Sequence, residues 1–532
     1  VKSQISTICL RIIMTQQYPF RNFYHIVATN AKNSPNKTII YDGDLKISNR
    51  QLMEYADSVA SRLYDYGIKP GDKVALVMAN SWQFIATLFA ISKLGAVVVA
   101  INNFLKEDEI AYIVNDSQAK VLFSSTKFAK ETRELLIKTN ICKIIWVDGD
   151  APVINDRNID YAKIIAEQKN TAPYADKSPE ELALIVYTSG TTGKPKGAML
   201  SYNNIHSNVH CCMQHLRVKH GGIRMVCYLP MFHAFTLTVT VILPIFTDSG
   251  VVVIRSIATK GDFANLLKQV LLKRVPFFAG VPDVYSALAK AKLPWYFHWF
   301  HSVKGFISGA APLAEETMRN FAASFKRGTL IQGYGISECS PVVSVNLPWE
   351  NRVGSVGKPL PSYQVEVFDE EMKQLPRDSI GEICVKGGCV MMGYYNRPND
   401  TAETIIDGWF RTGDIGRVDK DGFVFIVDRK KDLIISKGMN IYPREIEEII
   451  YTNEKVNACA VIGIRDSEAN ETPVAYVELK EDVTATESEL KDYIRPHLAP
   501  FKQPRKIIFI EKLPRNATGK ILKRELRELA HS

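Results

Sequence analysis

The sequence predicts an α/β fold with largely parallel sheets covered by helices, followed by a small α+β domain. Apolar strand-like runs alternate with amphipathic helical patterns from Phe20 onward, which is typical of parallel sheets with both faces covered. The charged run 428–432 interrupts this pattern, and the order of elements changes beyond it. We therefore expect a large domain over residues 1–428 and a small one over residues 429–532.

Helical and strand patterns follow one another in the first part of the large domain. Ser48 predicts the start of a helix, because its hydroxyl can accept a hydrogen bond from a free N–H group of the first turn. The elements expected next are a strand at 73–78, a helix at 82–94 and strands at 96–100, 121–123 and 143–147. We assign these elements to the architecture and not to the chemistry.

The stretch 187–197, YTSGTTGKPKG, is the first candidate site. It follows the apolar run 182–186, and a second short apolar run leads from it to Ser201, a candidate helix N-cap. Glycines let successive N–H groups converge on an anion, while hydroxyls add donors and lysines add charge. The stretch predicts a polyphosphate-binding loop between two strands. It is not a Walker loop, because Thr188 stands where that pattern needs glycine and Pro195 stands where it needs serine or threonine.

A charge-free run at 236–246 follows the motif YLPMFHAF at 228–235. Most of the run is expected to be a core element. His233 differs, because it is a histidine among aromatic residues at the head of an apolar segment. The residues alone leave two roles open for it, a structural histidine and a group at a binding site.

Two further motifs predict a nucleotide site. Residues 308–312 read SGAAP, and side chains this small would let a flat ring approach the backbone, although a simple turn before a helix from Leu313 is the alternative. Residues 330–341 read LIQGYGISECSP. In that motif Tyr334 can offer a ring face to a base, and Glu338 is the kind of oxygen ligand that Mg²⁺ takes together with phosphate oxygens.

The last motifs lie on either side of the expected domain boundary. Asp414 is expected in a tight glycine-flanked turn, where its carboxylate could accept two hydrogen bonds from a ribose diol. The charged run 428–432 is the expected hinge. The small domain is expected to contain a helix from Pro443, strands at 458–464 and 474–479, and a helix capped near Ser488. Lys520 lies in a glycine-containing loop, which is a weak signal by itself.

Taken in order, these motifs resemble the adenylate-forming superfamily of acyl-CoA synthetases, firefly luciferase and peptide-synthetase adenylation domains, most closely the bacterial fatty acid–CoA ligases. The resemblance covers nearly the whole chain. It implies a multi-lobed large domain of αβαβα sheets with a distorted β-barrel, and a small mobile α+β domain. Ser337 stands where the family usually has threonine, and we expect the hydroxyl to keep its phosphate contact.

The resemblance also implies roles for individual residues. The implied catalytic residues are Lys520, Thr188, Lys196, Glu338 and His233, the implied metal ligands are Glu338 and Thr188, and the implied hinge is Lys431. The implied nucleotide and coenzyme contacts are Thr188, Ser189, Gly190, Thr191, Thr192, Gly193, Lys194, Gly309, Ala310, Ala311, Gln332, Gly333, Tyr334, Gly335, Ser337, Asp414, Arg429, Lys437 and Gly438. The implied contacts to the acid are His233, Phe235, Val281, Gly309 and Gly335.

We therefore predict ATP- and Mg²⁺-dependent ligation of a long- or medium-chain fatty acid to coenzyme A through an acyl-adenylate, with release of AMP and pyrophosphate. Within the same fold, an acyl-carrier-protein ligase, an aryl-CoA ligase and a fatty acyl-AMP ligase remain alternatives. A non-catalytic nucleotide- or RNA-binding protein would need clustered Lys and Arg with exposed aromatic residues, whereas the charges look dispersed along the sequence. A kinase would form ADP instead of AMP.

Composition limits the setting of this chemistry. The net charge of +9 is interpreted as a solvated surface, while peripheral contact with the inner face of a membrane and a homodimer stay open. Nine cysteines without metal-ligand spacing indicate buried thiols in a reducing cytoplasm. No apolar run approaches the ~20 residues that a membrane span needs. Arg11 and the lack of a cleavage site argue against a signal peptide, and the residues before Met14 are interpreted as an upstream extension.

Overall fold

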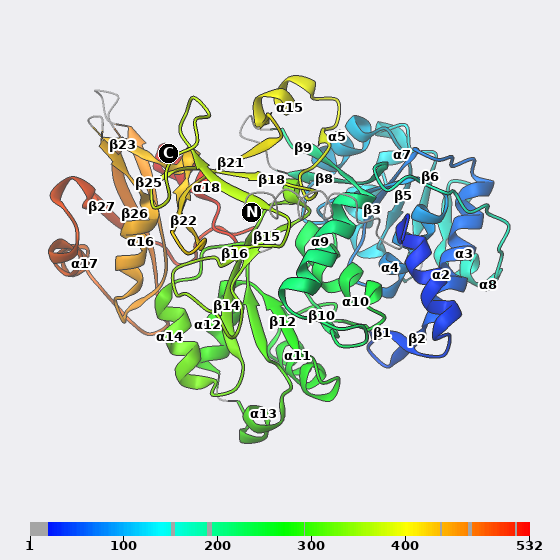
Figure 1. The fold of residues 1–532 in the computed structure, drawn as a ribbon, viewed down its shortest axis with the longest axis horizontal. Helices are drawn as coiled ribbons and strands as arrows, with labels where there is room; N and C mark the ends of the chain where they lie inside the picture. Colours follow the sequence, from blue (N-terminus) through cyan, green and yellow to red (C-terminus); the bar gives the residue numbers. More distant parts are fainter. Residues whose placement is uncertain are drawn as a thin grey trace, which may run out of the picture.

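The computed structural model describes residues 20–149, 155–188, 194–291, 293–436, 439–465, 471–516 and 519–531. It confirms the predicted α/β class, with a large N-terminal part and a smaller C-terminal part. Figure 1 shows the large part in blue to yellow and the smaller part, in orange and red, at one end of the molecule.

An eight-stranded sheet forms one lobe, with strand order β19-β9-β8-β4-β3-β5-β6-β7. Its strands are β3 (Lys73–Val77), β4 (Val97–Ala100), β5 (Ala119–Ser124), β6 (Lys143–Trp146), β7 (Asn158–Asp160), β8 (Leu182–Thr188), β9 (Lys196–Ser201) and β19 (Gly393–Tyr394). The strands from β8 to β7 run parallel, while β9 is antiparallel to β8. The predicted parallel sheet is thus present.

Helices cover both faces of this sheet. The helices of the lobe are α2 (Phe23–Asn33), α3 (Asn49–Asp65), α4 (Trp82–Lys93), α5 (Glu107–Ser117), α6 (Ala129–Thr132), α7 (Leu135–Lys138), α8 (Tyr161–Ala166) and α9 (Tyr202–His215), with a 3-10 turn η1 (Thr126–Phe128). Ser48 caps α3 as predicted, accepting from the N–H of Gln51. Along β3, Val74 packs on the side of α2, α3, α4 and α9, and Ala75 packs on the side of α5. This alternation explains why the strands are apolar throughout.

A second lobe contains a five-stranded sheet and a four-stranded sheet. The first has the order β12-β13-β14-β15-β16 and the second β10-β11-β1-β2. Their strands are β1 (Thr38–Asp42), β2 (Leu45–Ser48), β10 (Met225–Cys227), β11 (Val251–Val253), β12 (Phe277–Gly280), β13 (Gly305–Ser308), β14 (Thr329–Gly335), β15 (Val342–Val345) and β16 (Lys358–Pro359). The helices are α11 (Lys260–Leu272), α12 (Pro282–Lys290), α13 (Trp295–Phe300) and α14 (Glu315–Ser324), with a 3-10 turn η3 (Ser337–Cys339). The helix expected from Leu313 therefore begins two residues later.

A curled sheet completes the large part and corresponds to the expected distorted barrel. Its order is β17-β18-β21-β20, and β22 pairs with β21. The strands are β17 (Gln364–Phe368), β18 (Gly381–Lys386), β20 (Ile405–Ile406), β21 (Trp409–Val418) and β22 (Val424–Arg429), and α15 (Pro398–Thr404) precedes β20. Because β22 continues to Arg429, it crosses the expected boundary between residues 428 and 429, and that boundary stays a prediction.

The C-terminal part is built on the sheet β25-β26-β27 and the hairpin β23-β24. Its elements are η4 (Lys430–Asp432), β23 (Ile434–Ser436), β24 (Met439–Ile441), α16 (Pro443–Tyr451), β25 (Val456–Arg465), β26 (Glu471–Leu479), α17 (Glu487–Ile494), η5 (Arg495–His497), η6 (Pro500–Lys502), β27 (Lys506–Phe509) and α18 (Lys523–His531). Pro443 opens α16 as predicted. The helix expected to be capped near Ser488 is α17, and its N-cap is Thr486, two residues earlier, in a capping box with Glu489.

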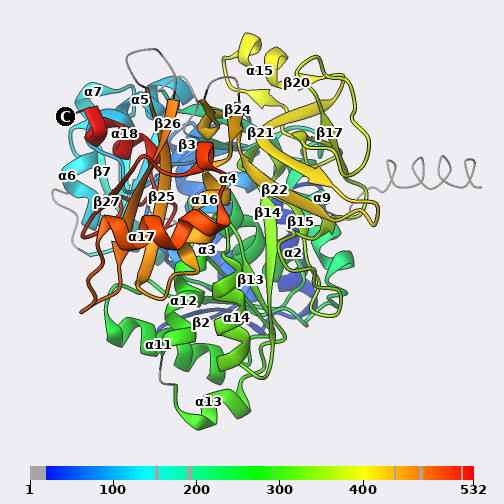
Figure 2. The ribbon, with the colours of Figure 1, turned by 90° about the vertical axis from the view of Figure 1, so that its left-hand side faces the viewer.

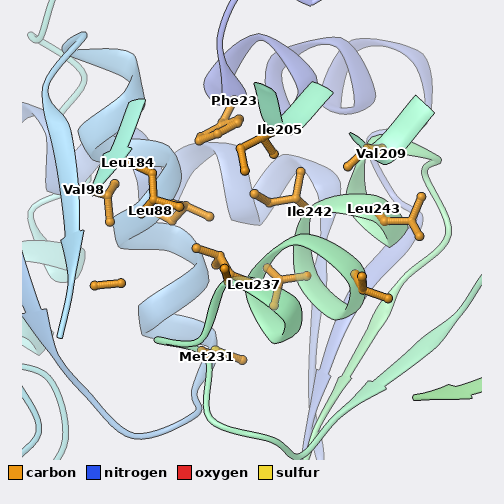
Figure 3. Packing of buried hydrophobic residues seen from close by; sticks show 14 of the residues in the cluster. Phe23, Leu88, Val98, Leu184, Ile205, Val209, Met231, Leu237, Ile242 and Leu243 are labelled. Carbon is orange, nitrogen blue, oxygen red and sulfur yellow. The ribbon is translucent and has the colours of Figure 1, made fainter. Parts of the chain in front are cut away.

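The charge-free run after Phe235 lies in the largest core. It forms a π-helix, η2 (Thr236–Ile242), continued by α10 (Leu243–Phe246), and all its residues are buried. Figure 3 shows Leu237, Ile242 and Leu243 among Phe23, Leu88, Ile205 and Val209 from α2, α4 and α9. The run thus fixes the segment that follows His233 against three helices of the first lobe.

The described residues contain neither a disulfide nor a helix that could span a membrane. Their eight cysteines are all free thiols, seven of them buried, and Cys142 is exposed. Across those same residues, no helix combines the length and the apolarity that crossing a bilayer would take.

Candidate nucleotide and acid site

The predicted strand–loop–strand arrangement at 187–197 is confirmed at its two ends. β8 and β9 pair antiparallel, with Thr188 opposite Lys196. Ser201 then caps α9, accepting a hydrogen bond from the N–H of Asn204, as its position predicts. The loop residues between the strands lie outside the described part of the chain. They are Ser189, Gly190, Thr191, Thr192 and Gly193.

Glu338 is held by two hydroxyl groups from distant parts of the chain. Thr188 donates from its Oγ1 to Oε1 of Glu338 at 3.0 Å, and the Tyr394 hydroxyl donates to the same oxygen at 3.1 Å. Thr188 ends β8, Glu338 lies in η3, and Tyr394 lies in β19. Since both donors use Oε1, the second carboxylate oxygen is left for a further ligand.

The two lysines of the loop motif have different surroundings. The Lys196 ammonium forms an ion pair with Asp400 at 2.5 Å and lies 5.4 Å from the centre of the Tyr394 ring. Lys194 is exposed, and its ammonium lies 5.5 Å from the centre of the Tyr112 ring. In this conformation Lys196 is therefore tied to α15, whereas Lys194 is accessible.

Asp414 joins the five-stranded sheet that contains β14 to the curled sheet that contains β21. Its Oδ2 accepts a 2.6 Å hydrogen bond from the Tyr334 hydroxyl, and its Oδ1 lies 2.9 Å from Nε of Arg429. Burial, together with the nearby Asp414 charge, raises the pKa of Tyr334 well above its ordinary value. Tyr334 therefore stays protonated and can keep donating this bond.

The prediction that Asp414 lies in a turn was wrong, because it lies within strand β21. Glu382 of β18 pairs with Ile415 of β21, and Cys384 of β18 pairs with Arg411 of β21. More residues separate Arg411 from Ile415 than separate Glu382 from Cys384, so β21 bulges at this point. Gly413 supplies the positive φ of +69° that this bulge uses. The glycines that suggested a turn thus serve a bulge, and a bulge re-aims the side chain beside it.

The β14 segment brings several predicted contacts to one strand end. Gln332, Gly333 and Tyr334 lie in β14, which ends at Gly335, and Ser337 opens the following η3 turn. A Cβ on Gly335 would come within 2.0 Å of the Pro341 carbonyl oxygen, so only glycine fits there. This close approach folds the chain back immediately before Glu338.

Strand β13 ends beside the same region. Ser308 pairs in register with Gln332 of β14. Ser308 Oγ and Gln332 Oε1 are buried and have no hydrogen-bond partner among the described residues. A Cβ on Gly309 would lie 3.8 Å from the Phe235 ring, and Ala310 has a positive φ of 66° before Ala311. The predicted small-residue turn is therefore present, and it leaves two polar atoms that a bound ligand could satisfy.

Lys520 reaches this region from the C-terminal part. Its backbone N–H donates to Asn516 Oδ1 at 2.9 Å, and a Cβ on Gly519 would lie 3.2 Å from Asp283 and 3.7 Å from Val281 at the start of α12. The pKa of Lys520 is lowered to about 8, first by burial and then by the Arg429 charge. Lys520 is thus mostly protonated at neutral pH but can be discharged under mildly alkaline conditions.

His233 is neutral at physiological pH. Burial and then the Lys520 charge lower its pKa to about 4. The Lys520 charge thus acts on His233, as the Arg429 charge acts on Lys520, which indicates that the three groups lie near one another. A neutral imidazole offers one donor and one acceptor, so His233 can position a carboxylate but does not supply the cation.

Comparison with known proteins decides the family. The AMP-binding enzyme profile matches residues 27–395, and the AMP-binding enzyme C-terminal domain profile matches residues 445–520. The chain belongs to the AMP-binding enzyme family. It is an AMP-forming acid–thiol ligase of this family, for which ATP, Mg²⁺ and coenzyme A are the expected substrates and cofactor.

Three relatives of this AMP-binding enzyme show the range of its similarity. A long-chain-fatty-acid–CoA ligase of Bacillus subtilis (strain 168) is 33% identical, over 96% of this chain and 95% of its own. A 4-coumarate–CoA ligase of Nicotiana tabacum is 30% identical, over 90% of each chain. The ATP-bound crystal structure of MatB from Rhodopseudomonas palustris superimposes with a TM-score of 0.86 at 30% identity, over 96% of this chain and 99% of that one.

Ion pairs fasten the C-terminal part of this AMP-binding enzyme near the predicted hinge. Arg527 of α18 pairs with Asp432 at 2.8 Å. Between the two parts of the chain, Arg515 pairs with Asp283 at 3.4 Å. Lys431 lies exposed in η4 beside Asp432, while Lys437 and Gly438 lie outside the described residues, between β23 and β24.

The lowered pKa of Lys520 predicts a pH limit for the AMP-binding enzyme. We expect kcat/KM for ATP in pyrophosphate exchange to fall above about pH 8, because this parameter reports the free enzyme and Lys520 loses its proton there. The Lys431→Ala variant should move this limb to higher pH, since a nearby cation that lowers the pKa is gone. An unchanged limb in the variant would assign the titration to another group.

Sequence patterns alone missed several partners in this AMP-binding enzyme. Tyr394 bonds to Glu338 and Asp400 to Lys196, yet neither belongs to a motif that the residues suggested. Thr412 was also missed, although its Oγ1 accepts from the Asp414 N–H at 3.0 Å. Tyr394 and Asp400 lie in the short segment 393–400. The sequence of this segment shows no pattern that is strong enough to indicate a site.

Proposed function

We propose that the chain ligates a long- or medium-chain fatty acid to coenzyme A through an acyl-adenylate. The observation that carries this proposal is the arrangement around Lys520 and His233. A carboxylate beside the Lys520 ammonium would have its hydrocarbon chain next to a segment, 235–246, that contains no charged side chain. Apolar walls with few polar groups suit such a ligand. The similarity to a long-chain-fatty-acid–CoA ligase agrees with this assignment.

Two displacements make up the proposed reaction. An oxygen of the fatty acid carboxylate attacks the α-phosphorus of ATP, and the bond from that phosphorus to pyrophosphate breaks. The thiolate of coenzyme A then attacks the acyl carbon, and the bond to AMP breaks. The first step brings two anions together, so it depends on cations and on positioning. In our proposal Lys520 supplies the cation beside the carboxylate and the α-phosphate.

Nucleotide binding is assigned to the groups that meet at the ends of β13, β14 and β21. In this proposal Asp414 accepts both ribose hydroxyls, since each carboxylate oxygen keeps a lone pair beyond its bond to Tyr334 or Arg429. The segment 309–311 lies along the adenine ring. The unsatisfied atoms of Ser308 and Gln332 support a polar ligand beside this segment.

The residues present fit the Mg²⁺ that this chemistry expects. Among the described residues no cluster of three His, Cys, Asp or Glu side chains could hold a metal alone. Mg²⁺ commonly takes one or two carboxylates and completes its shell with water and phosphate oxygens. Glu338, with Thr188 beside it, meets that pattern. When bound, the ion would neutralise phosphate charge, and Glu338 would hold it through the oxygen that is not engaged by the hydroxyls.

Removing the Tyr394 hydroxyl should weaken Mg²⁺ binding. The Tyr394→Phe variant is expected to raise the Mg²⁺ concentration for half-maximal activity by about 10-fold, because a group that orients a metal ligand is lost. Titration of pyrophosphate exchange with Mg²⁺ measures this. Tyr395→Phe is the matched control, since Tyr395 instead donates its backbone N–H to Gly197. Equal Mg²⁺ dependence of the two variants would refute the orienting role.

The second half-reaction is assigned to the C-terminal part. We propose that this part turns about Lys431 and brings the hairpin β23-β24 with Lys437 and Gly438 to the pantetheine arm of coenzyme A. The turn would withdraw Lys520, which the first half-reaction needs. Near α12, the polar contacts between the parts include Lys290 to Asn457, at 3.1 Å, and Arg515 to Asp283. Pairs of this kind cost little to separate.

One assay tests the substrate assignment. AMP formation with coenzyme A should be measured for straight-chain acids of rising length and for 4-coumarate. We expect kcat/KM to rise about 4-fold per added methylene until the site is filled, because each buried methylene contributes ~0.8 kcal/mol. A preference for 4-coumarate would favour an aryl-CoA ligase. Pyrophosphate exchange without thioester formation would favour an acyl-AMP ligase, and transfer only to acyl-carrier protein would favour that acceptor.

A further inference from the structure

Helix α13 carries an exposed aromatic cluster at one extremity of the molecule. The cluster consists of Trp295, Trp299, Phe300 and Tyr296, which are 70%, 67%, 66% and 46% exposed. Figures 1 and 2, which view the molecule from directions 90° apart, both show α13 at the lower tip of the ribbon. Aromatic rings in water this close together mark a contact surface more often than a chance arrangement.

The helix that carries the cluster is anchored to the core of the second lobe. Phe297, the residue between the exposed rings, is only 4% exposed and packs in the core that contains Phe306, Phe321 and Phe325. Its ring lies 5.5 Å from that of His301. The Arg327 guanidinium donates to the Trp299 carbonyl oxygen and fixes the end of the helix. The four rings are therefore presented by an anchored helix, and they have no room in the core beneath it.

Three of the four exposed rings contact one another. The Trp295 ring lies 6.1 Å from Tyr296 and 6.3 Å from Phe300, at interplanar angles of 79° and 60°. Rings that shield one another in this way are poorly placed to stack on successive bases of a nucleic acid, which need free parallel faces. The Arg327 guanidinium, which contacts the helix, already donates to the Trp299 carbonyl oxygen. The geometry thus favours insertion of the cluster as a whole over stacking.

The segment around α13 is strongly basic. Residues 263–330 contain nine Lys or Arg and three Asp or Glu, a net charge of +6 out of the +9 of the whole chain. No carboxylate side chain occurs between Asp283 and Glu315. Lys304 and Lys326 are exposed, and each lies next in sequence to a residue of the core beneath α13, Val303 and Phe325 respectively. Lys and Arg are about as frequent here, 9 in 68 residues, as in the whole chain, 66 in 532, so their expected dispersal stands, and the local positive charge comes from the scarcity of carboxylates.

We propose that the α13 cluster is a membrane-docking surface that seats in the interface of an anionic bilayer. Trp and Tyr rings favour the headgroup level of a bilayer, and nearby lysines are attracted by anionic headgroups. A second copy of this chain is a poorer occupant, since a two-fold contact would bring the same basic segment against itself. The six-residue helix can insert only shallowly, so the contact is peripheral and reversible.

Vesicle binding of the full chain tests the proposal. Co-sedimentation should show binding to vesicles of phosphatidylcholine with phosphatidylglycerol, and much weaker binding to phosphatidylcholine alone. The W295A/W299A/F300A variant should lose at least about 10-fold in binding. Lys304→Glu combined with Lys326→Glu should weaken binding to the anionic vesicles only. Trp349→Ala is the matched control, because Trp349 is also exposed, at 51%, but lies outside the segment.

Two further measurements separate insertion from loss of folding or self-association. In the wild type, lipids brominated on their acyl chains should quench tryptophan fluorescence, and W295F/W299F should bind but lose most of the quenching. The triple alanine variant should keep AMP formation from a short water-soluble acid, which shows that it folds. Equal vesicle binding by this variant and the wild type would overturn the proposal. The proposal would also be overturned if the wild type formed a dimer without binding vesicles and the variant were monomeric. Binding of an oligonucleotide that depends on α13 would overturn it as well.

Discussion

Replacing Lys520 with alanine is expected to slow the first half-reaction by about 10²- to 10³-fold, the scale of removing one group that stabilises developing charge. Burial and then the Arg429 charge lower the pKa of Lys520, and the Asp414 charge also acts on it, so Lys520 lies near two groups that we assign to the nucleotide site. Transfer from a supplied acyl-adenylate to coenzyme A should fall far less, because no new anion has to approach the α-phosphate in that step. ATP–pyrophosphate exchange and thioester formation from acyl-adenylate measure the two steps separately.

The Lys512→Ala variant is the matched control for Lys520→Ala. Lys512 is an exposed lysine of the same C-terminal part, and its removal should leave both half-reactions unchanged. Equal losses in the two half-reactions of Lys520→Ala would show that the residue acts on folding or on domain placement in general. A loss confined to thioester formation would show that Lys520 acts in the second half-reaction, which would contradict the proposal.

Removing the Asp414 carboxylate is the second change with a large expected effect. Asp414→Ala should raise KM for ATP by about 10- to 100-fold, since hydrogen bonds to a charged group each contribute ~1.5–3 kcal/mol. The loss is compounded because the Arg429 guanidinium and the Tyr334 hydroxyl lose their partner. Asp414→Asn, which keeps an acceptor for Tyr334, should be affected less. Pyrophosphate exchange over a range of ATP concentrations gives both values.

A control for Asp414 comes from a second buried aspartate of the same part of the chain. Asp419 is 7% exposed and pairs with Arg352. Asp419→Ala should lower thermal stability without a change in KM for ATP. If Asp414 contacts the ribose diol, Asp414→Ala should weaken the binding of ATP more than the binding of 2′-deoxy-ATP, which already lacks one hydroxyl. An equal loss of affinity for the two nucleotides would show that Asp414 does not contact the diol.

Local patterns predicted most of the elements and much of the site. Ser48 and Ser201 cap the helices that they were expected to cap, because a hydroxyl before an amphipathic run has few other uses. The alternation of apolar strands and helices gave the parallel sheet. Two contacts join residues of different motifs: Asp414 is bonded to Tyr334, and Thr188 is bonded to Glu338.

What could not be predicted depends on pairing between distant segments. Gly413 looks like a turn residue, and only the register of β21 against β18 shows that it serves a bulge. The bond from Tyr394 to Glu338 spans 56 positions in sequence and leaves no local signal. The exposed cluster on α13 was also hidden, because apolar rings in a sequence are expected inside and only the fold shows which remain outside.

The register of β21 against β22 has a consequence for how the two parts of the enzyme communicate. Asp414 and Arg429 are cross-strand partners, and η4, which contains the proposed hinge residue Lys431, begins at the very next residue. A nucleotide that contacts Arg429 therefore acts on the last residue before the proposed hinge. By thermodynamic reciprocity, whatever turns the C-terminal part must change the affinity for nucleotide by the same factor as the nucleotide changes the turn. Release of AMP and return of the moving part are, on this view, one coupled event.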